Sequence, residues 1–108
     1  MSVGTKLAVI LHCDVVESTA LVTKDERLAH KRIHDTFTRL SETVSKFDGT
    51  THELRGDALL AEFERASDAV SAALTFQDSN AAFNQNLNDD IRPAVRIGIA
   101  LGEIVIAD

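Results

Sequence analysis

In the stretch "LAVILHCDVVESTA" (residues 7–20) a carboxylate directly follows the most apolar run of the chain. Residues 7–13 form a continuous apolar run, which predicts a strand buried on both faces. Asp14 then stands at the end of that strand, and Glu17 follows three residues later. Since ligands often gather at strand ends, Asp14 is the first candidate for a functional residue.

Apolar residues recur at helical spacing further along the chain. This spacing predicts one helix that begins near Lys24 or Asp25 and ends at "DG" (residues 48–49), where Gly49 can adopt the left-handed conformation of a helix cap. We interpret the stripe as the face that packs on the sheet, with a dimer seam as the alternative. Its members are Ile33, Phe37, Leu40, Val44 and Phe47.

The remaining segments complete a regular pattern. Residues 50–54 and 58–63 predict two short strands, joined by a tight turn at "RGD" (residues 55–57). A second helix, capped by Ser67, is predicted to run to about Phe83 and is rich in alanine. After the polar loop "NQNLNDD", alternation from Val95 predicts another strand, and "EIVIAD" (residues 103–108) reads as a trailing strand.

The order β-α-β-β-α-β predicts an α+β fold of the ferredoxin-like kind: an antiparallel sheet with both helices on one face, plus the trailing strand. In this topology the first strand lies beside the third. Asp14 ends the first strand, and Asp57 lies in the turn that precedes the third. The two aspartates are therefore expected to meet in space, although they lie far apart in the sequence.

Composition excludes several classes of function. The chain has 108 residues, one cysteine and a formal net charge of −6, so we expect a single domain over residues 1–108 and a reducing, cytoplasmic setting. Its acidity argues against nucleic acid and against anionic lipid as partners. No apolar run reaches the length that a membrane helix needs, so we expect no membrane contact.

Two neighbouring carboxylates repel one another unless a proton or a divalent cation lies between them. Oxygen ligands led by carboxylates favour Mg²⁺ or Mn²⁺. The alternative is that Asp14 and Asp57 are ordinary turn residues. A zinc site is a weaker alternative, suggested by His12 beside Cys13 and by the i, i+4 spacing of His30 and His34. We expect those histidines to be solvated and Cys13 to be buried.

The motif "DVVEST" (residues 14–19), followed by "RGDALLAEF" (residues 55–63), resembles the first half of the class III nucleotide cyclase catalytic domain. The stretch "IGIALGE" (residues 97–103) resembles a third motif of that family. The resemblance runs through nearly the whole chain in the same element order. The matching positions are Asp14, Val15, Ser18 and Thr19 in the first motif, and Gly56, Asp57, Ala61 and Phe63 in the second.

The resemblance implies conversion of ATP or GTP to the 3′,5′-cyclic nucleotide and pyrophosphate, in signalling. Asp14, Asp57 and the backbone carbonyl of Val15 would bind two Mg²⁺ or Mn²⁺ ions. Backbone amides of Glu17, Ser18 and Thr19 would face the phosphates. The ribose 3′-hydroxyl would attack the α-phosphorus, with the metals lowering its pKa and neutralising the triphosphate.

The chain departs from the family pattern at two positions. Glu17 stands where the family usually has glycine, which lets the backbone approach phosphate. An inward carboxylate would repel a triphosphate, whereas an outward one would be harmless. Glu53 stands where adenylyl cyclases often carry lysine. A carboxylate can accept the two N–H donors of guanine, so Glu53 favours GTP, unless it is simply a solvated strand residue.

The family's later motif, which supplies an asparagine and an arginine across a head-to-tail dimer, is absent from the 108 residues. We therefore expect a homodimer for the complete domain and no cyclase activity from residues 1–108 alone. Three alternatives stay open: a degenerate cyclase-like module that binds a nucleotide or a partner without catalysis, a diguanylate-cyclase-type domain, and a ferredoxin-like protein with no nucleotide role. The lack of a GGDEF-like signature argues against the second.

Overall fold

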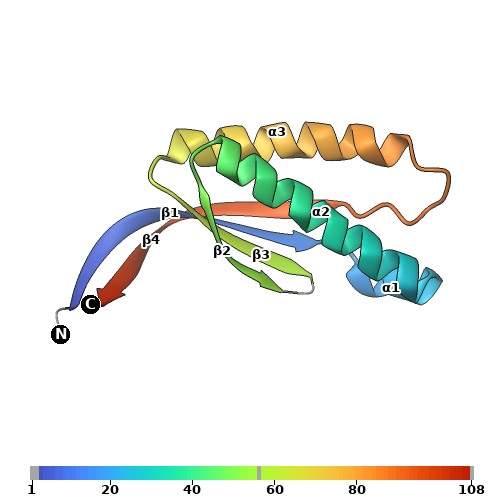
Figure 1. Cartoon of the computed structure of the whole chain (residues 1–108), viewed down its shortest axis with the longest axis horizontal. Coiled ribbons are helices and arrows are strands. Elements are labelled where there is room, and N and C mark those ends of the chain that lie inside the picture. The colour runs from blue at the N-terminus through green and yellow to red at the C-terminus, as the bar shows by residue number, and fades with distance from the viewer. Residues whose placement is uncertain (1–2, 56, 108) are drawn as a thin grey trace.

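In the computed structural model, two long helices and one short helix accompany a four-stranded antiparallel sheet (Figure 1). The structure describes residues 3–55 and 57–107, with the side chains of Val3, Glu53, Arg55 and Ala107 left out of the description. The elements are β1 (Val3–Val15), α1 (Ser18–Lys24), α2 (Glu26–Lys46), β2 (Thr50–Arg55), β3 (Ala58–Phe63), α3 (Ala66–Gln85) and β4 (Val95–Ala107).

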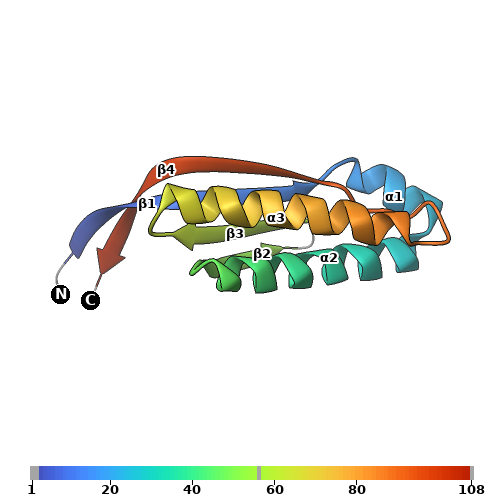
Figure 2. The ribbon, with the colours of Figure 1, turned by 90° about the horizontal axis from the view of Figure 1, so that it is seen from above.

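The sheet has the order β2-β3-β1-β4, with every neighbouring pair antiparallel. The predicted ferredoxin-like fold and the neighbourhood of the first and third strands are thus confirmed. The long helices α2 and α3 both lie on one face of this sheet (Figure 2). The segment predicted as a separate trailing strand instead continues β4, which pairs with β1 from Val95 to Ala107 without a break.

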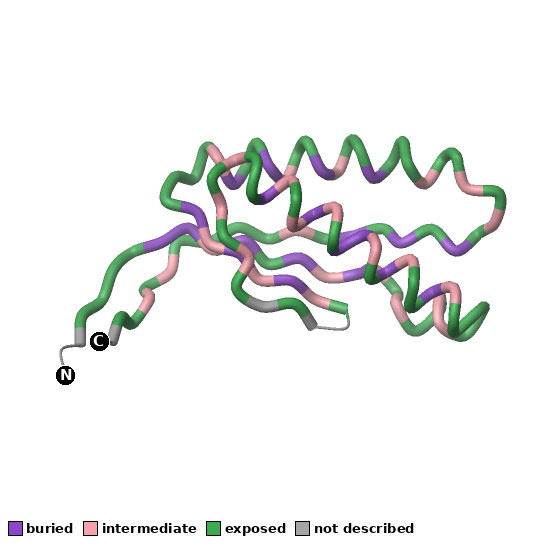
Figure 3. The backbone as a smooth tube through the Cα atoms, in the orientation of Figure 1, coloured by how far each residue is buried: buried purple, intermediate pink, exposed green. Residues whose placement is uncertain are grey.

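The core lies between the sheet and the two long helices (Figure 3). The apolar stripe of α2 faces the sheet, as predicted, and its dimer-seam alternative is wrong. The largest fully buried side chains include Leu11, Phe37, Leu40, Leu59, Phe63 and Phe76. At the end of β1 one face is covered and the other is open: Leu11 and Cys13 are buried, but His12 between them is exposed. The prediction of a strand buried on both faces is therefore wrong there, because both long helices of the described residues lie on the same face of the sheet (Figure 2).

An aspartate stands at each end of the first long helix, α2, and the two play different roles. Asp25 caps its N-terminus, where the carboxylate accepts a hydrogen bond from the amide of Leu28 at 3.0 Å. At its C-terminus Asp48, rather than Gly49, adopts the left-handed conformation, with φ of 64°. Gly49 is needed for space instead: a Cβ there would lie 2.5 Å from the Phe63 ring and 2.7 Å from Val44.

The second long helix, α3, begins two residues earlier than predicted. Its N-cap is Arg65, which makes no capping hydrogen bond through its side chain, so the prediction that Ser67 is the cap is wrong. Arg65 instead contacts Asp68 at 3.3 Å between Nε and Oδ2. An acid in the first turn complements the positive end of the helix and can replace a capping hydroxyl.

Polar contacts hold the loop between α3 and β4 against both helices. Arg32 on α2 donates two hydrogen bonds to the carboxylate of Asp89, at 3.1 and 3.0 Å, and one to the carbonyl of Ile91 at 2.8 Å. The side-chain amide of Asn80 donates to the carbonyl of Pro93 at 2.9 Å. Bidentate arginine–carboxylate contacts fix orientation as well as distance. They therefore help to set where β4 begins, and with it the register beside Asp14.

Candidate functional site

The two predicted aspartates lie at the same end of adjacent strands. Asp14 is the residue of β1 that pairs with Ala58, the first residue of β3, and Asp57 immediately precedes Ala58. The amide of Val15 donates a hydrogen bond to the backbone carbonyl of Asp57 at 3.2 Å. The strand end of β1 and the turn before β3 are thus joined directly. The structure brings Asp14, Val15 and Asp57 together, as the topology predicted.

The turn between β1 and α1 adopts the backbone conformation that favours glycine. Glu17, the N-cap of α1, has φ of 52° and ψ of 45°, in the left-handed region. This conformation costs a side-chain-bearing residue on the order of 1 kcal/mol. The carbonyl of Glu17 accepts hydrogen bonds from the amides of Ala20 and Leu21 at 3.0 and 3.3 Å. The turn therefore keeps the shape that glycine would allow, although glutamate occupies it.

Two separate cavities lie on either side of α1. One, of about 200 Å³, is lined by Asp57 and Ser18 together with Val22, His30 and Ile33. The other, of about 180 Å³, lies between α1 and the loop before β4, and Glu17 lines it with Lys24 and Arg92 among others. Glu17 is exposed. It therefore lines a different cavity from Asp57, which favours the outward alternative for its carboxylate.

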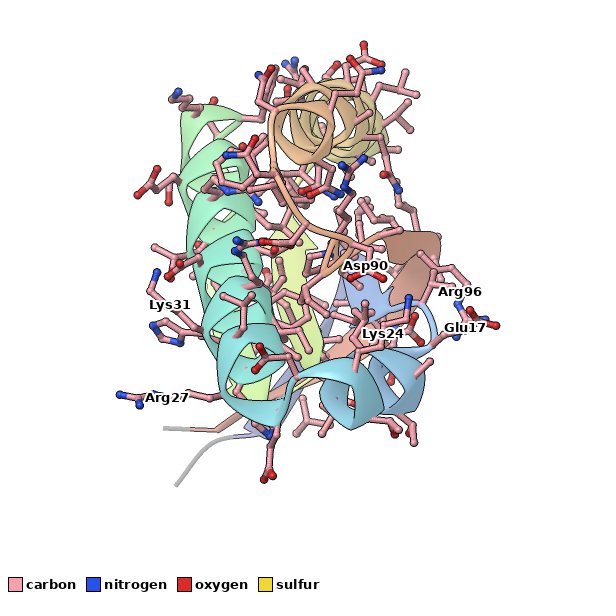
Figure 4. All side chains as sticks on the ribbon, turned by 90° about the vertical axis from the view of Figure 1, so that its right-hand side faces the viewer. Glu17, Lys24, Arg27, Lys31, Asp90 and Arg96 are labelled. Carbon is pink, nitrogen blue, oxygen red and sulfur yellow. The ribbon has the colours of Figure 1, made fainter. Side chains whose placement is uncertain are left out.

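Arg96, which the sequence patterns do not single out, contacts the candidate site directly. Its Nε lies 3.1 Å from Oδ1 of Asp14, and the two residues are direct partners across β1 and β4. Figure 4, viewed from the α1 end of the molecule, labels Arg96 and Glu17 in this region. Strand alternation alone could not have found this contact, because it requires the register between two strands that are distant in sequence.

The backbone amides of Glu17, Ser18 and Thr19, which are expected to face phosphate, donate no hydrogen bond to the backbone of the described residues. The amide of Val16, by contrast, donates to the carbonyl of Ala94 at 2.8 Å. The first amides of a helix have no partner within the helix. They are therefore available to an external acceptor.

The side chain of Glu53 and the whole of Gly56 lie outside the described residues. The backbone of Glu53 pairs with Leu60, after an irregularity in the register between β2 and β3. The role of Glu53 in reading the base therefore remains a prediction. The same holds for the conformation of the turn at "RGD", whose flanking residues Arg55 and Ala58 pair as a hairpin requires.

The residues behind the zinc alternative are not gathered. Burial, assisted by the charge of Asp14, raises the pKa of the Cys13 thiol to about 12, so the thiol stays neutral and is a poor metal ligand. His12, His30 and His34 are all exposed. Over residues 3–55 and 57–107, no group of three or more histidine, cysteine or acidic side chains has metal-binding geometry.

The oxygens of the aspartate pair fit a hard divalent cation. Asp14 and Asp57 contribute carboxylates and Val15 a backbone carbonyl, which are the donor types that Mg²⁺ and Mn²⁺ prefer. Mg²⁺ is commonly held by only one or two carboxylates, with phosphates and water completing its shell. The donor types of these three residues are therefore of the kind that such a cation takes.

The chain is similar to several nucleotide cyclases. The chain is 32% identical over 108 residues to the curated protein named "Putative adenylate cyclase 3" of Rhizobium meliloti (strain 1021). It is 26% identical, with a TM-score of 0.82, to the adenylate/guanylate cyclase/hydrolase from Silicibacter pomeroyi. It matches the guanylyl cyclase Cya2 with 21% identity and a TM-score of 0.80. No protein-family model matches the chain.

These similarities cover almost all of this chain but only part of its relatives. Each of the three matches includes 99% of the chain, which corresponds to 18% of the Rhizobium protein, 63% of the Silicibacter chain and 59% of the Cya2 chain. In fold and sequence the chain is therefore similar to adenylate and guanylate cyclases, and it spans less than two thirds of the length of each of these relatives.

None of the helices in the described part of the chain is both long enough and apolar enough to cross a bilayer.

Proposed function

We propose that the chain forms the metal- and phosphate-binding part of a cyclase that converts a purine nucleoside triphosphate to its 3′,5′-cyclic nucleotide. The observation that carries this proposal is the meeting of Asp14 and Asp57, linked through the Val15 amide and the Asp57 carbonyl. Similarity to cyclases of both nucleotide specificities supports the reaction class but leaves the base open.

In this proposal the chain binds and orients rather than transferring protons itself. The carboxylates of Asp14 and Asp57 and the carbonyl of Val15 would hold two divalent cations, Mg²⁺ or Mn²⁺. Bound there, such cations lower the pKa of the ribose 3′-hydroxyl and neutralise charge on the triphosphate. The open amides of Glu17, Ser18 and Thr19 would donate hydrogen bonds to the phosphate oxygens.

The residues that complete the reaction are proposed to come from outside residues 1–108. Family members supply an asparagine and an arginine across a homodimer, and the sequence of this chain contains no matching motif. We therefore infer that residues 1–108 alone bind nucleotide with a metal but do not cyclise it, and that a homodimer of the complete domain does.

The experiment compares residues 1–108 with a chimera in which the missing part of the domain is supplied by the Silicibacter protein. Both are incubated with ATP and with GTP, each in Mg²⁺ and in Mn²⁺, and the cyclic nucleotide is measured by mass spectrometry. We expect product from the folded, dimeric chimera and none from the shorter chain. A folded dimeric chimera that makes neither cyclic nucleotide would reject the catalytic proposal.

A second candidate function is a cyclase-like regulatory module that binds a nucleotide without catalysis. Glutamate at the left-handed position 17 favours it, because the strained turn has lost the glycine typical of active relatives. The two functions separate in the same experiment. Metal-dependent binding of ATP or GTP by the chimera, without any cyclic product, would identify the regulatory module.

A further inference from the structure

The contact between Arg96 and Asp14 is fixed by the architecture of the sheet. The two residues face each other directly across β1 and β4. The next pair along the strands, Val15 with Val95, is buried on both sides, with exposed fractions of 5% and 6%. Buried neighbours hold this register. The position of the Arg96 guanidinium beside Asp14 is therefore set by strand pairing and not by a flexible loop.

The arginine side chain is nevertheless free to leave. Its side chain is 71% exposed and that of Asp14 is 36% exposed. The described contact is a single one, from Nε of Arg96 to Oδ1 of Asp14, and not a bidentate pair. Exposed ion pairs of this kind contribute little to stability. Rotation of Arg96 away from the sheet therefore breaks one weak contact and leaves the core intact.

We propose that Arg96 is a resident counter-ion of Asp14 that competes with the divalent cation for this carboxylate. This inference rests on the metal site of the proposed function. A guanidinium hydrogen-bonded to Oδ1 occupies a position from which a cation would be bound, and two positive charges at one carboxylate repel each other. Arg96 thereby lowers the affinity of the site for metal alone, and the cation is held more tightly when additional ligands, such as phosphate oxygens, compensate.

The test measures binding of Mn²⁺ alone, in the absence of nucleotide, to the 108-residue chain by electron paramagnetic resonance of the free ion. Arg96→Gln removes the competing charge. Arg92→Gln is the matched control, because it removes the same charge from the adjoining loop, where Arg92 donates to the carbonyls of Asp89 and Leu87. Arg96→Lys keeps the charge, and Asp14→Asn removes the carboxylate. Circular dichroism verifies the fold of each variant.

We expect Arg96→Gln to bind Mn²⁺ about two- to fivefold more tightly than the wild type, which is roughly 0.4–1 kcal/mol and lies within the range of exposed ion pairs. Arg96→Lys and Arg92→Gln should stay within about twofold of the wild type, and Asp14→Asn should bind least. Raising the salt concentration should shrink the gain of Arg96→Gln, because salt screens exposed charges.

Equal or weaker Mn²⁺ binding by folded Arg96→Gln, with measurable binding by the wild type, would overturn the competitor role while leaving the metal site in place. An equal gain in Arg92→Gln would also overturn it, because the effect would then come from net charge. If the wild type and Arg96→Gln, both folded, bind no Mn²⁺, the metal site itself is rejected, and the inference fails with it.

Discussion

The amide of Val15 and the carbonyl of Asp57 are joined by a 3.2 Å hydrogen bond that ties the end of β1 to the turn before β3. The bond uses only main-chain atoms, so it survives substitution of either side chain. The carboxylate of Asp57 is exposed and is not needed for this connection. Changes to the carboxylate should therefore report on ligand binding without disturbing the geometry of the strand end.

Asp57→Asn is expected to abolish Mn²⁺-dependent binding of ATP or GTP, because it removes one of two carboxylates that would hold the cation. Its thermal midpoint should stay close to that of the wild type. Asp48→Asn is the matched control: it removes an exposed acid at the far end of α2, and asparagine tolerates the left-handed φ of 64° there. Isothermal titration calorimetry measures both. Unchanged binding by Asp57→Asn would make this aspartate a structural turn residue.

Glu17→Gly tests whether the glutamate obstructs nucleotide binding. Glu17 and Asp57 line different cavities. We therefore expect the affinity for Mn²⁺–nucleotide to change by less than about twofold. The corresponding change in binding free energy is below ~0.6 kcal/mol, the smallest change taken as a resolved effect. Glu17→Asn separates charge from backbone, because asparagine also adopts the left-handed conformation but keeps a Cβ. A large gain in both variants, measured by calorimetry, would show that the carboxylate points inward.

Gly49→Ala is expected to destabilise the protein by about 1–3 kcal/mol, as overpacking of a filled core typically does. The new Cβ would lie 2.5 Å from the Phe63 ring and 2.7 Å from Val44, both fully packed core residues. Urea denaturation measures the change. Gly98→Ala is the control, since its Cβ would meet nothing within 4 Å. Equal stability of the two variants would show that the end of α2 can shift to make room.

The sequence predicted the meeting of Asp14 and Asp57 because it depends on element order alone. Once the order of strands and helices is known, the ferredoxin-like topology places the first strand beside the third. The helix that carries Ile33 and Phe37 is equally predictable from the sequence, since its apolar spacing repeats over several turns. These features follow from patterns that are local or that fold topology makes predictable.

Other features depend on competition between neighbours or on exact register, and the sequence could not resolve them. At the end of α2 both Asp48 and Gly49 could take the left-handed conformation; Asp48 takes it, and Gly49 lies where a Cβ would meet Phe63. The Arg96 contact to Asp14 requires knowing which residue of β4 faces which residue of β1. Alternation along one strand gives a face but not a partner.

The carboxyl of Glu62 is expected to contribute to the stability of the protein against acid. Hydrogen bonds from Lys6 and from His52 lower the pKa of this carboxyl below its usual value, at distances of 3.0 and 2.8 Å. A lowered native pKa stabilises the fold above the unfolded pKa, and this contribution is lost as the pH falls through the native pKa. Glu62→Gln should therefore show a shallower loss of urea stability between about pH 5 and pH 3.

Glu64→Gln provides the comparison for that titration, because Glu64 lies two residues further along and is exposed. It should follow the wild-type curve. If Glu62→Gln and Glu64→Gln lose stability with the same slope as the wild type, the contacts of Lys6 and His52 make no contribution to the pH dependence.

Cys13, the single cysteine of the chain, should report on unfolding through its reactivity. Burial, and secondarily the charge of Asp14, raises the pKa of its thiol from 9.0 to about 12. A shift of about three units lowers the thiolate fraction at pH 8 by roughly a thousandfold, and the thiolate is the reactive form. Iodoacetamide should therefore modify the native protein far more slowly than the urea-unfolded chain, as followed by mass spectrometry.

The same shift predicts how stability changes with alkaline pH. Because the native thiol holds its proton more tightly than the unfolded one, its contribution is complete below about pH 9 and is lost as the pH rises from there toward 12. Cys13→Ala should remove this loss while lowering stability at neutral pH by about 1 kcal/mol, since it vacates a small volume in the core. If iodoacetamide modifies Cys13 of the native protein at pH 8 at a rate within tenfold of its rate in the unfolded chain, the burial of this thiol is contradicted.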